Sequence, residues 1–271
     1  MDTPPPRRIA FIGGGNMASA LIGGLLRAGR DPAVITVVEP SEAQRDKLAQ
    51  AFCIQAQPDA DARLADAATV VWAVKPQLFA EAAAPCVPFV GAALQVSVMA
   101  GVRCAAVARA SGSARVVRAM PNMPALIGQG IAGLFATAEV EDAARTEVDA
   151  LFAPTGASLW LPCEADLDAV TALSGSGPAY VYYFLEAMMQ AAVEMGLTEA
   201  QGRLLAQHTF AGATALAQQS PLPPHELRAQ VTSRGGTTFA AISSLDDSGV
   251  KAAFVKALHA ARQRAAELGR A

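Results

Sequence analysis

Two short stretches of small and hydroxyl-bearing residues, 174–180 and 232–238, lie in the second half of the chain, each ahead of a helical pattern. We expect each to present backbone N–H groups and hydroxyls at a helix N-terminus, an arrangement that binds an anion such as a carboxylate. Either stretch alone would be interpreted as an ordinary capped helix start. Neither offers a side chain that titrates near neutral pH, so chemistry here would depend on hydrogen bonding and positioning.

A glycine-rich turn near the N-terminus has the spacing G-x-G-x-x-A, between an apolar run and a helical pattern. Gly13 permits the tight turn, Gly15 lets the backbone approach a pyrophosphate, and Ala18 lets the helix pack closely on the sheet. Asn16 and Met17 supply N–H groups at the helix N-terminus, where an anion binds. Glycine turns also serve packing alone, but the strand-then-helix context favours a dinucleotide site. Opposite such a site, the two later stretches favour binding of a substrate carboxylate.

Glu39 ends the second apolar run, 24 positions after Gly15, where dinucleotide folds place the residue that reads the adenosine ribose. A carboxylate there accepts hydrogen bonds from the ribose hydroxyls and repels a 2′-phosphate, so Glu39 favours NADH over NADPH. The alternatives stay open at this point. Glu39 could be a solvated acid before Pro40, and Arg45, one helical turn on, could still meet a phosphate.

The third apolar run, at 69–74, ends at Val74-Lys75-Pro76. Ligands of doubly wound sheets lie outside the carboxyl ends of the strands. Lys75 could therefore face the ribose or the phosphates of a cofactor. The alternative is a surface lysine in an ordinary turn.

The elements that would position these residues divide the chain in two. Up to residue 165, short apolar runs alternate with helical patterns, which predicts a doubly wound parallel sheet of the Rossmann type. Runs at 130–136 and 158–161 are expected to form an antiparallel pair. Only helical patterns follow. We predict an α/β fold with an NAD(P)-binding domain at 1–165 and an all-α substrate-binding and dimerisation domain at 166–271.

The helices of the second half are apolar nearly all round, as Tyr180, Phe184 and Met188 illustrate at helical spacing. A domain of about 105 residues has too little interior to bury such helices by itself. The pattern predicts a homodimer built through the C-terminal helices.

Composition disfavours several other classes of protein. Hydrophobic residues make up 52% of the chain and charged residues 17%, which disfavours disorder. The net charge is -3 and the basic residues are scattered, so we expect no nucleic-acid partner. Proline and glycine interrupt the uncharged stretch 82–102, and the N-terminus lacks an apolar signal region; we expect no membrane span and a cytoplasmic protein. Four cysteines without metal spacing indicate no metal site.

The scarcity of acid–base side chains indicates which group would be reduced. A hydroxyacid dehydrogenase needs a positioned His or Lys, yet lysines occur only at 47, 75, 251 and 256, and no histidine lies beside the two stretches. A protonated imine already attracts hydride, so the protein must mainly position it and hydrogen-bond its nitrogen. The hydroxyl of Thr238 suits that role.

Five segments in this order resemble the pyrroline-5-carboxylate reductase family. They are residues 11–18, 73–77, 118–124, 174–180 and 233–238, and the match spans residues 9–268. The last two together are specific, whereas the first alone is not. The resemblance implies a Rossmann domain followed by a helical dimerisation domain, with dimers assembled into larger rings. It also implies reduction of 1-pyrroline-5-carboxylate to L-proline with NADPH or NADH, the last step of proline biosynthesis.

The resemblance further implies roles for individual residues. Thr238 would hydrogen-bond the substrate nitrogen. The substrate carboxylate would be held by Ser233 and the backbone of Gly235, Gly236 and Thr237, and the floor near the nicotinamide would be shaped by Ser176 and Pro178. The cofactor would be lined by Val74, Lys75, Pro76 and Ala100. Two positions depart from the family pattern: Arg234 stands where many members have proline, and Glu39 stands where NADPH-preferring members have a small polar residue.

Two rival functions share parts of this plan. A β-hydroxyacid dehydrogenase would want a catalytic lysine in the helix at 178–195, which has none. A non-catalytic NAD(P)-binding regulator could lose the loop at 233–238 without penalty, yet the loop is intact.

Overall fold

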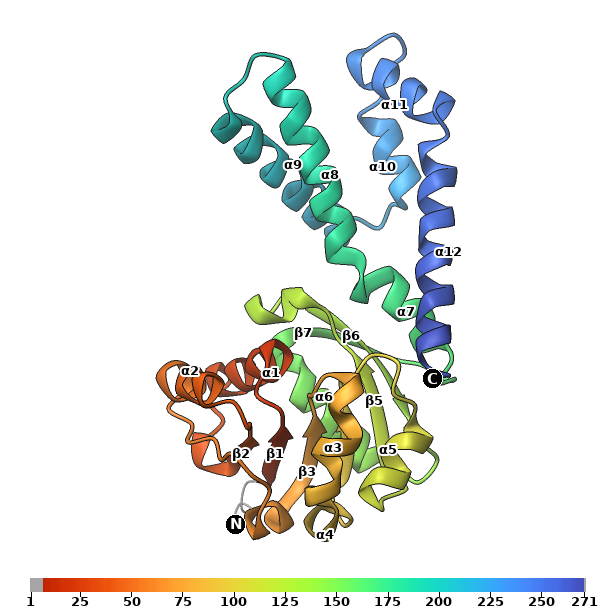
Figure 1. Cartoon of the computed structure of the whole chain (residues 1–271). Coiled ribbons are helices and arrows are strands. Elements are labelled where there is room, and N and C mark those ends of the chain that lie inside the picture. Colours follow the sequence, from red (N-terminus) through yellow and green to blue (C-terminus); the bar gives the residue numbers. More distant parts are fainter. Residues whose placement is uncertain (1–6, 271) are drawn as a thin grey trace. The chain divides into compact units, whose positions relative to one another are not determined.

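The computed structural model of the chain describes residues 7–270 (Figure 1). A seven-stranded sheet in the order β2-β1-β3-β4-β5-β6-β7 forms its first part. The strands are β1 (Arg8–Ile12), β2 (Ile35–Val38), β3 (Ala67–Trp72), β4 (Leu94–Ser97), β5 (Val116–Met120), β6 (Gly130–Ala136) and β7 (Gly156–Trp160). Neighbours run parallel except β5 and β6, so the predicted Rossmann-type sheet is confirmed.

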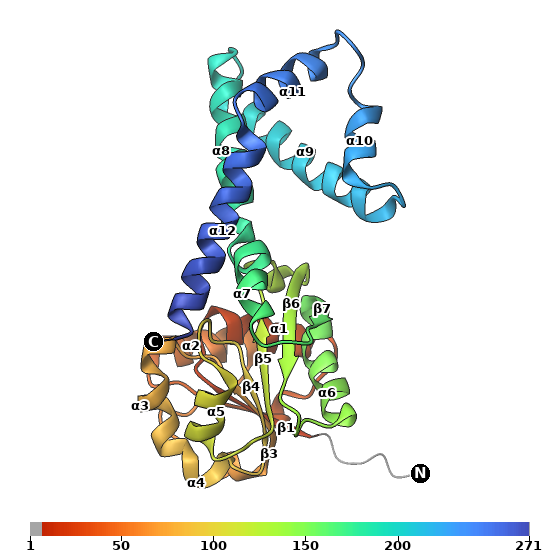
Figure 2. The same ribbon diagram turned by 90° about the vertical axis from the view of Figure 1, so that its right-hand side faces the viewer.

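Helices cover both faces of this sheet (Figure 2). One face packs against α1 (Asn16–Arg27), α2 (Glu42–Phe52) and α6 (Asp142–Phe152). The other packs against α3 (Phe79–Ala83), α4 (Val87–Val90) and α5 (Cys104–Ser111). Because both faces are covered, the inner strands are nearly continuous apolar runs, such as Ile9-Ala10-Phe11-Ile12 in β1, and all four of these residues are buried.

The predicted antiparallel pairing of β6 with β7 is wrong. These strands run parallel, with Gly130 opposite Gly156 and Leu134 opposite Trp160. Helix α6 lies between them in the sequence and carries the chain back to the same end of the sheet, which parallel neighbours require. The antiparallel neighbours are β5 and β6, where Met120 pairs with Gly133 across a short connection.

Short segments complete this part of the fold. The 3-10 turns are η1 (Pro32–Val34), η2 (Ala62–Asp66), η3 (Pro76–Leu78), η4 (Ala84–Cys86), η5 (Met123–Ile127) and η6 (Ala153–Thr155). After β7 the chain forms α7 (Asp166–Val170), which continues into the π-helical segment η7 (Thr171–Gly175).

Residues 177–260 form a second compact unit, while residues up to Ser176 and those from Ala261 onward belong to the first. Its helices are α8 (Gly177–Glu194), α9 (Glu199–Gln219), α10 (Pro224–Gln230), α11 (Thr237–Asp247) and the larger part of α12 (Val250–Leu268). The helical character expected for the second half is confirmed, and the division at residue 165 into two functional domains stays a prediction. Within residues 7–270, no helix combines the length and apolar character needed to cross a membrane.

The helical unit buries few of its own side chains. Among residues 177–260, all of which the structure describes, only Ala192, Gly202 and Ala206 are buried. Phe254 makes edge-on ring contacts with Tyr180 and Phe184, each with centroids 5.7 Å apart. Many large apolar side chains stay exposed, among them Val181, Tyr182, Tyr183, Met188, Val193, Leu204, Leu205, Leu216, Phe239, Leu245 and Val255. An apolar surface of this extent is typical of an interaction site.

Candidate functional site

The glycine-rich turn after β1 has the geometry that its sequence predicts. Gly13 has a φ of +96°, and a Cβ at this position would lie 2.7 Å from the carbonyl oxygen of Ala73, so only glycine fits. Gly15 is the N-cap of α1, and a Cβ there would meet no atom within 4 Å. Because Gly15 has no capping side chain, the first-turn N–H groups of α1 are open to an anion.

Glu39 lies against this turn. Its Oε2 accepts a hydrogen bond of 2.8 Å from the Gly14 N–H, and its Oε1 accepts one of 2.9 Å from the Ser41 N–H. Arg45 donates to the carbonyl oxygens of Glu39 at 2.9 Å and Pro40 at 2.7 Å. The carboxylate is therefore held at the carboxyl end of β2, and the Arg45 guanidinium is engaged by backbone groups.

A cavity of about 350 Å³ opens beside the turn, which is within the size range of small-molecule sites. Its lining is mostly apolar and comes from the ends of β1, β2 and β3 and from the segments that follow them: Ile12, Gly13, Val38, Pro40, Pro58, Asp59, Ala60, Val74, Leu78, Glu81, Ala82, Pro85 and Cys86. Apolar walls beside an anion-binding helix start and a fixed carboxylate fit the adenosine half of a dinucleotide. The residues present are therefore compatible with an NAD(P) cofactor.

None of residues 58–60 was among the predicted site residues, yet they form part of this cavity. After α2 the chain returns beside β2, because Gln57 bonds to the backbone of Val37 and Glu39, each at 2.8 Å. This pairing brings Pro58, Asp59 and Ala60 to the cavity wall. The apolar patterns contained no signal for it, since the contact is a single bridge outside any strand.

The residues that follow β3 and β4 lie at the same edge of the sheet, because these strands run parallel to β1. Lys75, Pro76 and Ala100 are exposed there, and Val74 is half-buried. Pro76 and Ala100 line a second cavity of about 800 Å³, together with Gly101, Val102 and Arg103. The structure thus gathers the predicted cofactor residues at one edge, and their roles stay predictions.

Helix α8 begins at Gly177, within the segment 174–180 as predicted, but it follows η7 almost directly, which corrects the interpretation of the Ser176 N–H group as free. The chain is already helical from Asp166, and the Ser176 N–H donates to the Thr171 carbonyl oxygen at 2.8 Å, five residues back. Such π-helical turns occur often at functional sites. Gly175 packs against the Met120 side chain at the end of β5, since a Cβ on this glycine would lie 2.5 Å from the Cε atom of Met120.

The segment 232–238 does begin a helix, in the second unit. Gly236 is the N-cap of α11, no side chain caps it, and no acidic residue lies in the first turn. Gly235 has a φ of +75°, and the Gly236 N–H donates to the Ser233 carbonyl oxygen at 3.0 Å. Ser233 and Thr237 are exposed, and Thr238 is half-buried. The first-turn N–H groups of α11 are therefore open to an anion, and the role of this loop in holding a carboxylate stays a prediction.

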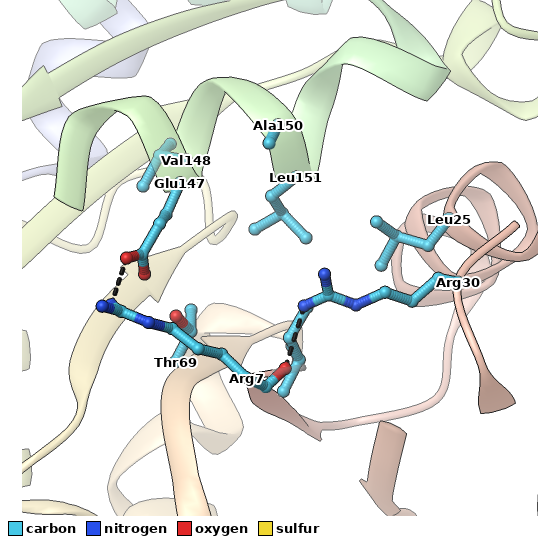
Figure 3. Close-up of a pocket in the computed structure, with 9 residues that line it drawn as sticks. Arg7, Leu25, Arg30, Thr69, Glu147, Val148, Ala150 and Leu151 are labelled. Carbon is cyan, nitrogen blue, oxygen red and sulfur yellow. Dashed lines mark hydrogen bonds and ion pairs between the residues drawn. The ribbon is translucent and has the colours of Figure 1, made fainter. Parts of the chain in front are cut away.

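A third cavity, of about 190 Å³, lies at the amino ends of β1 and β3 (Figure 3). It is lined by Arg7, Arg30 and Glu147 among others, and Arg7 forms an ion pair with Glu147. None of the predicted site residues lines it. It is therefore separate from the edge at which the cofactor residues gather.

Comparison with known proteins agrees with this geometry. Residues 164–268 match the family described as pyrroline-5-carboxylate reductase dimerisation, and residues 8–101 match NADP oxidoreductase coenzyme F420-dependent. The chain is 44% identical to the pyrroline-5-carboxylate reductase of Pseudomonas aeruginosa, over 99% of this chain and 98% of that protein. It is 38% identical to that of Haemophilus influenzae, over 96% of this chain and 97% of that protein.

Solved structures are similar over nearly the full length. The pyrroline-5-carboxylate reductase of Coxiella burnetii superposes with a TM-score of 0.90 at 35% identity, covering 97% of this chain and 98% of that one. Pyrroline carboxylate reductase of Plasmodium falciparum, solved with NADP bound, superposes with a TM-score of 0.87 at 26% identity and the same coverage. The resemblance found from the motifs is confirmed, and this chain belongs to the pyrroline-5-carboxylate reductase family.

Proposed function

We propose that this protein reduces 1-pyrroline-5-carboxylate to L-proline with NAD(P)H, the last step of proline biosynthesis. The observation that carries the proposal is the 44% identity to a reductase of that name over nearly the whole chain. The chain also has uncapped N-termini at α1 and α11, where an anion could bind. The β-hydroxyacid dehydrogenase alternative is not favoured, because α8 contains no lysine. The regulator alternative is not favoured either, because the loop at 233–238 is intact.

The cofactor, when bound, supplies the hydride. The turn at Gly13 and Gly15 and the N–H groups of Asn16, Met17 and Ala18 would hold its pyrophosphate. Glu39 would accept hydrogen bonds from the adenosine ribose. The nicotinamide half would be lined by Val74, Lys75, Pro76 and Ala100.

The substrate site needs no ionising side chain. Ser233 and the backbone of Gly235, Gly236 and Thr237 would hold the carboxylate at the start of α11, and Ser176 with Pro178 would form the floor. Thr238 would donate its hydroxyl hydrogen bond to the ring nitrogen as the C=N electron pair moves there and the ring carbon gains hydride. Positioning a cation that already attracts hydride is enough to lower the barrier.

We also propose that NADH is the preferred cofactor. The Glu39 carboxylate is held by the Gly14 and Ser41 N–H groups, where its charge would oppose a 2′-phosphate. Arg45 is engaged by the backbone and is a poor candidate for a compensating cation. The relative from Plasmodium falciparum was solved with NADP bound, so both NADH and NADPH belong in the test of this preference.

For assembly, we propose a homodimer through the helical unit, further assembled into a ring of dimers, in the cytoplasm. Support for the dimer comes from the exposed apolar side chains of residues 177–260 and from the dimerisation family matched there. Light scattering of the purified protein would measure the assembly.

The experiment measures oxidation of NADH and NADPH by the purified protein with 1-pyrroline-5-carboxylate and, separately, reduction of NAD⁺ with a 3-hydroxyacid. We expect turnover of the imine only, and formation of proline in equal amount to the cofactor oxidised. Turnover of the hydroxyacid but not the imine would establish the dehydrogenase. Cofactor binding without turnover of either would establish the regulator.

A further inference from the structure

Arg103 and Asp168 form an ion pair, with 2.7 Å between Nη2 of Arg103 and Oδ2 of Asp168. Arg103 lies in the connection from β4 to α5, and Asp168 lies in α7, 65 positions later. The two side chains are 25% and 9% exposed, so the pair is largely removed from water. Separating the two side chains would leave a largely buried charge without its partner, which is costly. The pair therefore keeps the two segments that carry it at a fixed distance.

A second contact beside this pair holds the same two segments together. Oε1 of Glu164 accepts hydrogen bonds from the Cys104 N–H at 2.7 Å and from Arg118 at 2.8 Å. Burial raises the pKa of Glu164, but these hydrogen bonds lower it, and the net shift is downward. The charged carboxylate therefore caps the N-terminus of α5, where a negative charge is stabilised.

Along the chain, Arg103 follows directly on the loop that carries Ala100, three residues earlier. Gly101 in this loop has a φ of +76°, and a Cβ there would lie 3.3 Å from the backbone of Leu268. A Cβ on Gly269 would lie 2.6 Å from Nε of Arg103. The end of α12 therefore packs on the loop, and Arg103 lies between α7 and the C-terminal residues of the described chain.

Asp168 lies in α7, and the helical segment that follows α7 leads to Ser176. Helix α7 continues without a break into η7, where the Thr171 carbonyl oxygen holds the Ser176 N–H. Gly175 packs against Met120 at the end of β5. A shift of Asp168 along α7 would therefore move Ser176.

We infer that Arg103 and Asp168 are positioning residues, which set the distance between the cofactor-lining loop at Ala100 and the substrate floor at Ser176. The inference rests on the proposed function, because the roles of Ala100 and Ser176 belong to it. The pair acts through the backbone segments that it joins, and contributes nothing to the binding of the adenosine half.

The kinetic test compares wild type with Arg103→Ala, Asp168→Asn and Arg103→Lys. Misplacement of reacting groups by about 1 Å can cost about 100-fold in rate, and we expect a loss of about tenfold in kcat for the first two variants. The dissociation constant of NADH, measured by fluorescence without substrate, should stay near the wild-type value. Arg103→Lys should recover most of the lost kcat, because it restores a charge opposite Asp168.

The matched control is Arg7→Ala, which removes an ion pair with Glu147 from the same unit at the opposite edge of the sheet (Figure 3). It should leave kcat unchanged. Unchanged kcat in folded Arg103→Ala, or an equal loss in Arg7→Ala, would overturn the inference. Inactive wild type would instead refute the proposed function.

Hydrogen exchange gives a readout independent of turnover. In Arg103→Ala we expect faster amide exchange both at 98–103 and at 171–176, with residues 13–18 unchanged. Asp168→Asn should loosen the same two segments, and the double variant Arg103→Ala/Asp168→Ala serves if a lone buried charge prevents folding. Faster exchange confined to the mutated segment would show that the pair does not couple the two.

Discussion

The Gly14 N–H donates a 2.8 Å hydrogen bond to the Glu39 carboxylate, so the residue that ends the β2 region is fixed to the turn that follows β1. The Ser41 N–H holds the other oxygen at 2.9 Å. A negative charge anchored at two points cannot swing away from an incoming phosphate. Under the proposed preference for NADH, cofactor choice would depend on a side chain that the glycine-rich turn itself orients.

Replacing Glu39 with Ser should shift the ratio of kcat/KM for NADPH over NADH upward by about tenfold. The change removes one charge near the 2′-phosphate position, and a charge pair at about 4 Å is worth roughly 1–4 kcal/mol in a surface site. Steady-state kinetics with each cofactor would measure it. Glu42→Ser, which removes the neighbouring acid of α2, is the control, and a ratio that does not move in Glu39→Ser would show that this carboxylate does not read the ribose.

Replacing Thr238 with Ala should lower kcat/KM for the imine by about 10- to 100-fold, since a hydrogen bond that strengthens in the transition state is lost. NADH affinity should stay near the wild-type value, and Thr238→Ser should recover much of the activity. Thr146→Ala, at an exposed position of α6, controls for loss of a threonine hydroxyl. Equal losses of imine turnover and cofactor affinity would contradict the role assigned to Thr238.

Two glycines of the same turn should respond in opposite ways to alanine. Gly13→Ala places a Cβ 2.7 Å from the Ala73 carbonyl oxygen at a φ of +96°, and should destabilise the fold by about 1–3 kcal/mol. Gly15→Ala meets no atom within 4 Å and should keep a Tm close to wild type, while its methyl group obstructs the pyrophosphate and weakens NADH binding. Thermal unfolding and NADH titration separate the two effects. A Gly15→Ala protein that binds NADH normally would place the pyrophosphate elsewhere.

Acid should remove the contribution of Glu164 to stability. The folded state lowers the pKa of this carboxyl from its ordinary value of 4.5, so its contribution is present above that pH and is lost as pH falls through the lower folded value. Glu164→Gln should therefore be less stable than wild type at neutral pH, and the difference should shrink below about pH 4.5. Urea unfolding at several pH values measures the difference. A gap that is constant with pH would mean that Glu164 acts only as a neutral acceptor.

Local spacing was enough to predict most helices, because their ends are set by residues close in sequence. Thr198 and Gln201 have the spacing of a capping box, and in the structure the Gln201 N–H donates to the Thr198 hydroxyl at 3.2 Å. Gly196 follows α8 and has a φ of +90°, a conformation that favours glycine at a helix end. The glycine-rich turn was predictable for the same reason, since the turn and the helix start that follows it lie within residues 13–18.

Contacts between distant segments decided the rest. The direction of β7 followed from the crossover through α6. The Ser176 N–H, expected from the sequence to be free, instead donates a hydrogen bond to Thr171 in the helical segment that begins at Asp166. The Arg103–Asp168 pair joins residues 65 positions apart, and no periodicity along the chain indicates such a partner. The amino-acid sequence thus determined the family, the glycine-rich turn and the ends of several helices, since these depend on neighbours within a few turns. Only the tertiary structure decided strand direction, the π-helical turn and the ion pair between the two lining segments, because each requires a partner brought close by folding.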